Sequence, residues 1–195
     1  IHPDAVKTGM ISSPEMIDVI ADVMEKYGVK QLVVDPVMIA TSGAQLIPEP
    51  AVERMRERLL PLARVITPNI PEAEVLWGHP IEGRKGMEEA AKWIGEEYGC
   101  AVLVKGGHNS ENASDLLFDQ GKMTWFNGER IHNPNSHGTG CTLSSAMASG
   151  LAKGLKLEEA VTSAKEYVTK ALAAMLDLGE GSGPLNHCFA IKEKS

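Results

Sequence analysis

The sequence lacks an excess of positive charge and a long apolar run. Its 19 lysines and arginines are outnumbered by 26 acidic residues, which gives a formal charge of −7 at pH 7. A nucleic-acid backbone is bound by a broad positive surface, so nucleic acid is not expected as a partner. No apolar run approaches the roughly 18 to 20 residues that cross a bilayer, and residues 1–4 lack the basic and apolar segments of a signal peptide. These absences predict a cytoplasmic protein that does not enter a membrane.

Cysteine is also scarce. The three cysteines, Cys100, Cys141 and Cys188, are odd in number and widely spaced, which fits neither a disulfide framework nor a paired C-x-x-C metal site. A chain of 195 residues with 43% hydrophobic content can bury a sizeable core but is short for two domains. One domain over residues 1–195 is therefore expected.

Short β-branched runs alternate with helical patterns along the first hundred residues. Ser13 is a candidate helix N-cap before Pro14, and Gly28 supplies a stop after the helical spacing that follows. Such alternation indicates an α/β fold, with a mainly parallel sheet and helices on its faces. Strands are expected at 5–8, 31–34, 64–67 and 101–104, and helices at 14–27, 49–60, 71–77 and 87–98.

The pattern changes after residue 114. Two apolar runs, 115–118 and 123–126, flank the turn sequence 119–122 and predict an antiparallel hairpin at the edge of the sheet. Two helical segments follow between residues 139 and about 176, the second with a continuous apolar stripe.

Polar residues follow several of the predicted strands. Asp35 comes after the second strand, Asn69 and Glu72 after the third, and Lys105 after the fourth. Ligands of open parallel sheets bind outside the carboxyl ends of the strands, so these side chains are expected to converge in a site suited to magnesium and phosphate. Each also has an ordinary structural interpretation: Asp35 as a turn cap, Asn69 as a helix cap, and Lys105 as a solvated strand end.

The segment 137–142, His-Gly-Thr-Gly-Cys-Thr, precedes a helix of small residues. Gly138 and Gly140 permit close or left-handed backbone, and a helix start presents free N–H groups to an anion. The chain contains no G-x-x-x-x-G-K-[ST] motif, so this is not a P-loop. A tight turn into a buried helix would explain the glycines but not Cys141, whose thiolate is favoured at a helix N-terminus as a base or nucleophile.

These segments together resemble the ribokinase-like superfamily and, within it, the hydroxymethylpyrimidine and phosphomethylpyrimidine kinases of thiamine biosynthesis. Most of the superfamily has an aspartate base where this chain has Cys141, and the pyrimidine kinases have cysteine there. The resemblance implies a three-layer α/β/α fold. It extends over residues 5–10, 35–38, 67–74, 104–108, 137–142 and 183–187.

The resemblance also implies an activity: ATP-dependent phosphorylation of 4-amino-5-hydroxymethyl-2-methylpyrimidine and then of its monophosphate, which gives the diphosphate. In this interpretation Cys141 is the base that takes the hydroxyl proton, and the backbone of Gly138, Thr139 and Gly140 stabilises charge on the transferring phosphoryl group. Gly9, Met10 and Val37 match positions that line the pyrimidine pocket together with Cys141, and for Met10 alone core packing is the default interpretation.

The same resemblance places nucleotide and metal. Lys105, Asn69 and Thr139 are expected at the ATP phosphates, and Asp35 and Glu72 at Mg²⁺. His108 is a further phosphate-binding candidate, while capping or packing is equally open for His108 and for His137. A homodimer is expected, because relatives commonly form one and an incomplete sheet edge would invite pairing.

The sequence departs from the family at its beginning. The family has an N-terminal stretch of some tens of residues with the first strands and polar groups that bind the pyrimidine, and nothing here corresponds to it, so the substrate half of the pocket is expected to be incomplete.

Three alternatives to the pyrimidine kinase stay open. They are a pyridoxine or pyridoxal kinase, a thiol acyltransferase in which a histidine such as His137 activates Cys141, and a non-catalytic nucleotide-binding remnant.

Overall fold

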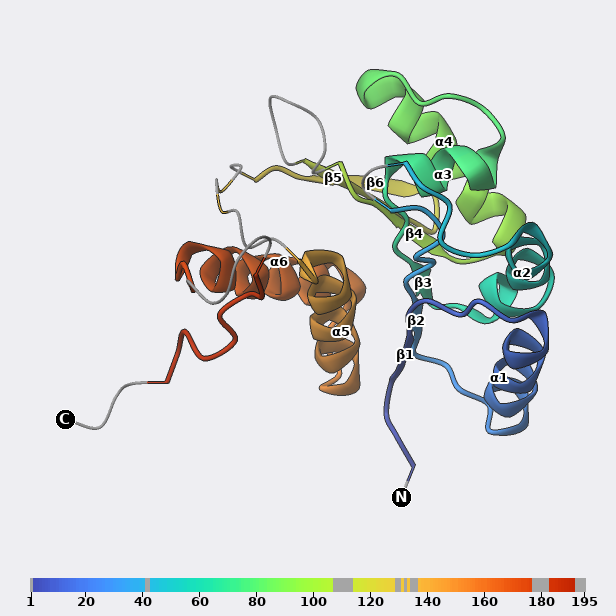
Figure 1. The fold of residues 1–195 in the computed structure, drawn as a ribbon, viewed down its shortest axis with the longest axis horizontal. Helices are drawn as coiled ribbons and strands as arrows, with labels where there is room; N and C mark the ends of the chain where they lie inside the picture. Colours follow the sequence, from blue (N-terminus) through green and yellow to red (C-terminus); the bar gives the residue numbers. More distant parts are fainter. Residues whose placement is uncertain are drawn as a thin grey trace.

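A computed structural model describes residues 2–40, 43–106, 114–128, 131, 133, 137–176 and 183–191, which form a six-stranded sheet between two layers of helices (Figure 1). The strands follow one another across the sheet in chain order, the first four parallel and the last two antiparallel. The α/β fold with a mainly parallel sheet and a hairpin edge is thus confirmed. The strands are β1 (Val6–Thr8), β2 (Leu32–Val34), β3 (Val65–Ile66), β4 (Ala101–Val104), β5 (Asp115–Asp119) and β6 (Lys122–Phe126).

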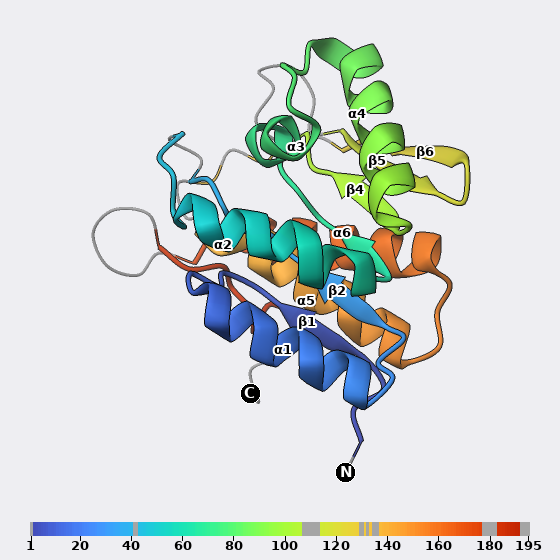
Figure 2. The same ribbon diagram turned by 90° about the vertical axis from the view of Figure 1, so that its right-hand side faces the viewer.

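The helices divide between the two faces of the sheet. Helices α1 to α4 cover one face and α5 and α6 cover the other (Figures 1 and 2). When successive parallel strands are added in one direction across a sheet, right-handed crossovers place all the connecting helices on the same face. The chain reaches the opposite face after the β5–β6 hairpin. The bounds are α1 (Pro14–Lys26), α2 (Glu49–Arg54), α3 (Ile70–Trp77), α4 (Gly83–Tyr98), α5 (Thr139–Ala152) and α6 (Leu157–Ala173).

Two apolar cores lie on the two faces of the sheet. In β2, Leu32 and Val34 pack toward α1 to α4, while Val33 between them packs toward α5 and α6. All three are fully buried, as a strand covered on both faces requires. This two-sided burial explains the unbroken apolar runs from which the strands were predicted.

Local signals set most of the element ends. Ser13 caps α1, its Oγ accepting the N–H of Met16 at 3.3 Å. The helix predicted over 49–60 is α-helical only to Arg54 and continues as a π turn (Met55–Leu59) and a 3₁₀ turn (Leu60–Leu62). Pro61 within that last turn has no N–H to continue an α-helical ladder. Among the described residues, no helix is long and apolar enough to span a membrane.

Candidate active site

The carboxyl ends of β2, β3 and β4 bring the predicted polar residues together. Because the three strands are parallel, their ends lie at one edge of the sheet. Lys105 follows β4, and its backbone pairs with that of Asn69, which follows β3. The expected convergence of Asp35, Asn69 and Lys105 is therefore present in the structure.

Asp35 is the centre of this cluster. It is only 1% exposed, and its Oδ1 accepts hydrogen bonds from Lys105 Nζ at 3.0 Å and from the Thr67 hydroxyl at 3.1 Å. Its Oδ2 lies 3.2 Å from the hydroxyl of Ser144 on α5. A buried carboxylate needs such partners, because an unpaired charge away from water is costly. The bonds join the sheet to the layer that contains Cys141.

The N-terminus of α5 faces the Lys105 ammonium. Gly138 is the N-cap, with a left-handed φ of 82° that glycine adopts without strain. The N–H of Thr142 bonds to the carbonyl of Gly138 at 2.8 Å, so the N–H groups of residues 139–141 precede the first bond of the helix. A Cβ on Gly140 would lie 3.3 Å from Lys105 Nζ, which places the ammonium against this turn. Lysine and helix terminus together favour an anion here.

Glu72 holds the loop after β2 to the start of α3. Its two oxygens accept the N–H of Met38 at 3.0 Å and that of Asn69 at 2.8 Å, while Asn69 Oδ1 accepts the N–H of Glu72 at 2.8 Å. The loop needs this support, because Val37, a β-branched residue, has a φ of +44°. Glu72 thus fixes a strained segment beside Asp35.

The charge of Glu72 responds to the whole cluster. Burial raises the pKa of Glu72 above its usual range, and the positive charge of Lys105 is the largest opposing influence. The negative charge of Asp35 raises this pKa further, and the N–H groups of Asn69 and Met38 lower it. The pKa of Glu72 therefore depends on the charges of both Asp35 and Lys105.

The carboxylates of Asp35 and Glu72 are suitable donors for Mg²⁺ in type. Asp35 Oδ1 already accepts two hydrogen bonds, but Asp35 Oδ2 and each Glu72 oxygen accept one, which leaves an acceptor position for a further ligand on each of these three oxygens. The described ranges contain no group of three or more His, Cys, Asp or Glu side chains able to hold a metal. Mg²⁺ commonly keeps several waters and uses one or two carboxylates with substrate phosphates, so this pair fits it.

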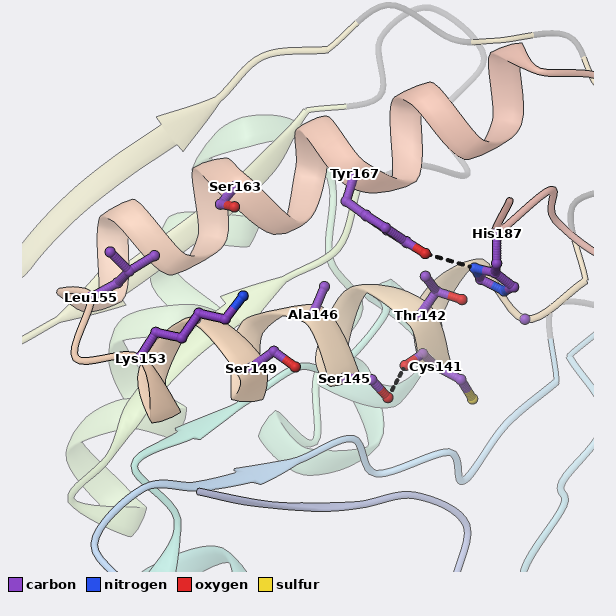
Figure 3. Close-up of a pocket in the computed structure, with 12 residues that line it drawn as sticks. Cys141, Thr142, Ser145, Ala146, Ser149, Lys153, Leu155, Ser163, Tyr167 and His187 are labelled. Carbon is purple, nitrogen blue, oxygen red and sulfur yellow. Dashed lines mark hydrogen bonds between the residues drawn. The ribbon is translucent and has the colours of Figure 1, made fainter. Parts of the chain in front are cut away.

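Cys141 opens onto a pocket of about 640 Å³ along the outer face of α5 (Figure 3). The cysteine is exposed and lies at one end of the pocket, and Lys153 lies toward the other end. Tyr167 of α6 reaches across to His187, with 3.2 Å between the hydroxyl and Nδ1. The pocket therefore runs from the Cys141 thiol at the N-terminal turn of α5, past hydroxyl side chains, to a lysine at the far end of that helix.

Other predicted site residues are less closely tied to Cys141. Gly9 follows β1, and Met10 is 58% exposed. In the described part of the chain, neither these two nor Val37 lines the pocket beside Cys141. Thr139 is half-buried as the first residue of α5, and the roles of these four residues stay predictions.

The two candidate histidines have different outcomes. His137 is exposed, and its backbone forms a bridge with that of Pro184. His108 lies outside the described residues. Neither histidine is placed at a phosphate site by the contacts above.

Sequence reasoning missed four polar side chains of this region. Thr67 and Ser144 bond to Asp35, and Tyr167 and His187 line the pocket. The position of Thr67 as the last residue of the predicted strand 64–67 was the available signal for its role. Ser144 follows Gly140 by one helical turn, which puts it on the same face of α5.

The Cys100 thiol should react more slowly than the other two thiols. Burial raises the pKa of the Cys100 thiol to about 12, so only about 10⁻⁴ of it is ionised at pH 8. Cys141 and Cys188 are exposed. Iodoacetamide at pH 8, followed by peptide mass spectrometry, should label these two well before Cys100. Equal labelling of all three would contradict the packing of Cys100 beside β4.

Comparison with known proteins shows extensive similarity. The family model described as phosphomethylpyrimidine kinase matches residues 1–186. A hydroxymethylpyrimidine/phosphomethylpyrimidine kinase of Rhizobium meliloti is 48% identical over 187 residues, covering 94% of this chain and 70% of the relative. A thiamine biosynthesis bifunctional protein of Geobacter sulfurreducens is 47% identical over 194 residues, covering 99% of this chain. The chain spans only 40% of that bifunctional protein.

Solved structures show the same fold. A pyridoxal kinase of Bacillus subtilis in an ADP complex has a TM-score of 0.87 and 38% identity, covering 96% of this chain and 71% of its own. A phosphomethylpyrimidine kinase of Clostridium difficile has a TM-score of 0.78 and 44% identity, covering 88% and 70%.

Proposed function

Because the chain belongs to the phosphomethylpyrimidine kinase family, we propose that it transfers the γ-phosphoryl group of ATP to 4-amino-5-hydroxymethyl-2-methylpyrimidine. A second transfer to the monophosphate gives the diphosphate used in thiamine synthesis. One observation carries the proposal: the Lys105 ammonium, paired with buried Asp35, faces the N-terminal turn of α5 that also contains Cys141. Charge stabilisation and a proton acceptor are thus combined at one turn.

The N-terminal turn of α5 stabilises the transferring group. Negative charge spreads over the phosphoryl oxygens as the transfer proceeds, and fixed N–H donors stabilise it without reorganising. The backbone of Gly138, Thr139 and Gly140 provides this environment, and Lys105 adds a positive charge from the sheet side. The geometry supports an anion hole assembled from a helix start and one lysine.

Cys141 accepts the proton of the attacking hydroxyl group. As the new bond from the substrate oxygen to the γ-phosphorus forms, the bond from that phosphorus to the bridging oxygen of ATP breaks and ADP leaves. The proton passes to the Cys141 thiolate, which becomes a thiol. The exposed position of Cys141 in the N-terminal turn of α5, which faces Lys105, supports this role.

Asp35 and Glu72 would hold Mg²⁺ at the ATP phosphates. A bound Mg²⁺ supplies positive charge that shields the triphosphate. In this chain Asp35 presents its carboxylate from the end of β2, and Glu72 from the first turn of α3. Lys105 sits beside both and contacts the phosphates as a point charge.

The remaining predicted residues complete the two subsites in this proposal. Gly9, Met10 and Val37 line the pyrimidine subsite, and the exposed, apolar side chain of Met10 suits a flat heterocycle. Asn69, Thr139 and His108 contact the nucleotide. Asn69 also caps α3, so its amide has a structural duty in addition.

Phosphorylation of pyridoxal is a second candidate function. It is favoured by the close match in fold to the Bacillus subtilis pyridoxal kinase. Both substrates are flat heterocycles with a hydroxymethyl group, and the residues near Cys141 would treat either hydroxyl in the same way.

Turnover of the two substrates by the 195-residue chain tests the proposal. ADP release and product mass should show ATP-dependent phosphorylation of the pyrimidine, with a higher kcat/KM than for pyridoxal. A higher kcat/KM for pyridoxal would favour the second candidate. ATP binding without transfer to either substrate would contradict both and support a nucleotide-binding remnant, and ATP-independent acylation of Cys141 would indicate a thiol acyltransferase.

The proposed unit is one domain that forms a homodimer. One sheet and its two helix layers contain the site residues described above, which supports a single domain. Strand β1 lies at an edge of this sheet, and Val19 of α1 and Tyr27, which follows that helix, are more than half exposed. Such an edge and apolar surface support pairing between copies.

A further inference from the structure

A second ion pair, which is partly buried, lies beside the residue that follows Lys105. Asp115, the first residue of β5, is 6% exposed. Its Oδ1 accepts the N–H of Gly106 at 2.9 Å, and its Oδ2 accepts a hydrogen bond from Lys165 of α6. The carboxylate therefore joins the loop after β4 to the helix layer on the other side of the sheet.

This pair holds the backbone directly next to Lys105. On one side, the N–H of Lys105 bonds to the carbonyl of Pro68 at 2.8 Å. On the other side, Gly106 is held by Asp115 and packed so closely that a Cβ would lie 2.1 Å from the carbonyl oxygen of Ser114. The main chain at 105–106 is thus fixed from two directions, and only the lysine side chain extends into the site.

We propose that Asp115 and Lys165 are positioning residues that set where the Lys105 ammonium stands relative to Asp35 and the N-terminus of α5. The inference rests on the proposed function, in which Lys105 contacts the ATP phosphates. Helix α6 packs against α5, so Lys165 also links this loop to the layer that contains Cys141. Both residues act through Lys105, and neither touches the substrate.

The variant Asp115→Asn tests the pair with little change in shape. The amide oxygen still accepts the N–H of Gly106, while the charge that holds Lys165 is lost. We expect the KM for ATP to rise about tenfold, because a small misplacement of a binding group is expensive, with the KM for the pyrimidine unchanged. Lys165→Met leaves Asp115 intact and should also raise the KM for ATP. This variant keeps the test available if Asp115→Asn does not fold.

Asp119→Asn is the matched control. Asp119 lies at the other end of β5, where its carboxylate pairs with Arg64 through two bonds of 3.0 and 2.9 Å. This variant also removes a partly buried ion pair from the same strand, so it should lower the melting temperature comparably. The KM for ATP should stay at the wild-type value, which separates positioning from general stability.

A chemical readout of Lys105 keeps the two proposals distinguishable. Acetylation of Lys105, followed by peptide mass spectrometry, needs no activity and reports how well the ammonium is held against Asp35. Asp115→Asn should raise the acetylation rate several-fold and Asp119→Asn should not. If Asp115→Asn and Asp119→Asn have the same acetylation rate at Lys105 and the same KM for ATP, the positioning role is overturned even if the wild type is a kinase. If the wild type transfers no phosphoryl group, but Asp115→Asn raises the acetylation rate of Lys105 and Asp119→Asn does not, the positioning role is supported and the kinase activity is refuted.

Discussion

Replacing Cys141 by alanine should lower phosphoryl transfer by about 10²- to 10⁴-fold, the usual contribution of a positioned general base. ATP affinity should remain, because the Lys105 ammonium and the backbone of the α5 N-terminus do not depend on the thiol. The measurements are kcat for the pyrimidine and the Kd for ATP by calorimetry. A fall in kcat without a change in ATP binding is the expected signature.

The control for this experiment is Cys188→Ala. Cys188 is exposed like Cys141, but it follows the bridge at Pro184 and lies outside helix α5. Both substitutions are at exposed positions and should change the free energy of unfolding by no more than about 0.5 kcal/mol. Unchanged turnover in Cys141→Ala would remove the thiol from the mechanism, and a water molecule or another side chain would then have to accept the proton.

The convergence of the polar residues at one edge of the sheet could be predicted because it follows from topology. Parallel strands end at a common edge, so Asp35, Asn69 and Lys105 had to converge once the strands were recognised. The hairpin had a similarly local cause, since 119–122 is a turn sequence between two apolar runs. In each case the signal lies within a few residues of the feature that it predicts.

The partners of the site residues could not be predicted in the same way. The bond from Ser144 to Asp35 joins residues 109 positions apart, and that between Asp115 and Lys165 joins residues 50 apart. Such pairs depend on how helices pack on the sheet, which no local pattern encodes. Ser144 and Lys165 looked like ordinary helix residues for this reason.

For Asn69, the structural and the functional interpretation are compatible. The residue does cap α3, as its ordinary interpretation predicted, and its backbone is also paired with Lys105. The capping box places the Glu72 carboxyl group where it accepts the N–H of Met38 and where the charge of Asp35 raises its pKa. One local motif therefore builds part of the cluster, and a structural duty does not argue against a role in the site.

The variant Lys105→Met should lose both stability and transfer. It leaves Asp35, which is 1% exposed, without its positive partner, and breaking a buried pair in this way costs about 3–5 kcal/mol of unfolding free energy. Lys105 also opposes the raised pKa of Glu72 more than any other group, so its loss should raise that pKa further. Urea denaturation and the rate of ADP release measure the two effects.

The double variant Asp35→Asn with Lys105→Met separates these effects. Removing both charges eliminates the unpaired carboxylate, so stability should recover in part, while transfer stays low because the phosphates still lack the ammonium and Mg²⁺ lacks the Asp35 carboxylate. As a control, Lys92→Met removes an exposed pair with Glu96 at 3.9 Å and should change stability by no more than about 0.5 kcal/mol. Recovery of transfer together with stability would mean that Lys105 and Asp35 act only by supporting the fold, since neither the ammonium nor the carboxylate would then remain to contact a phosphate or Mg²⁺.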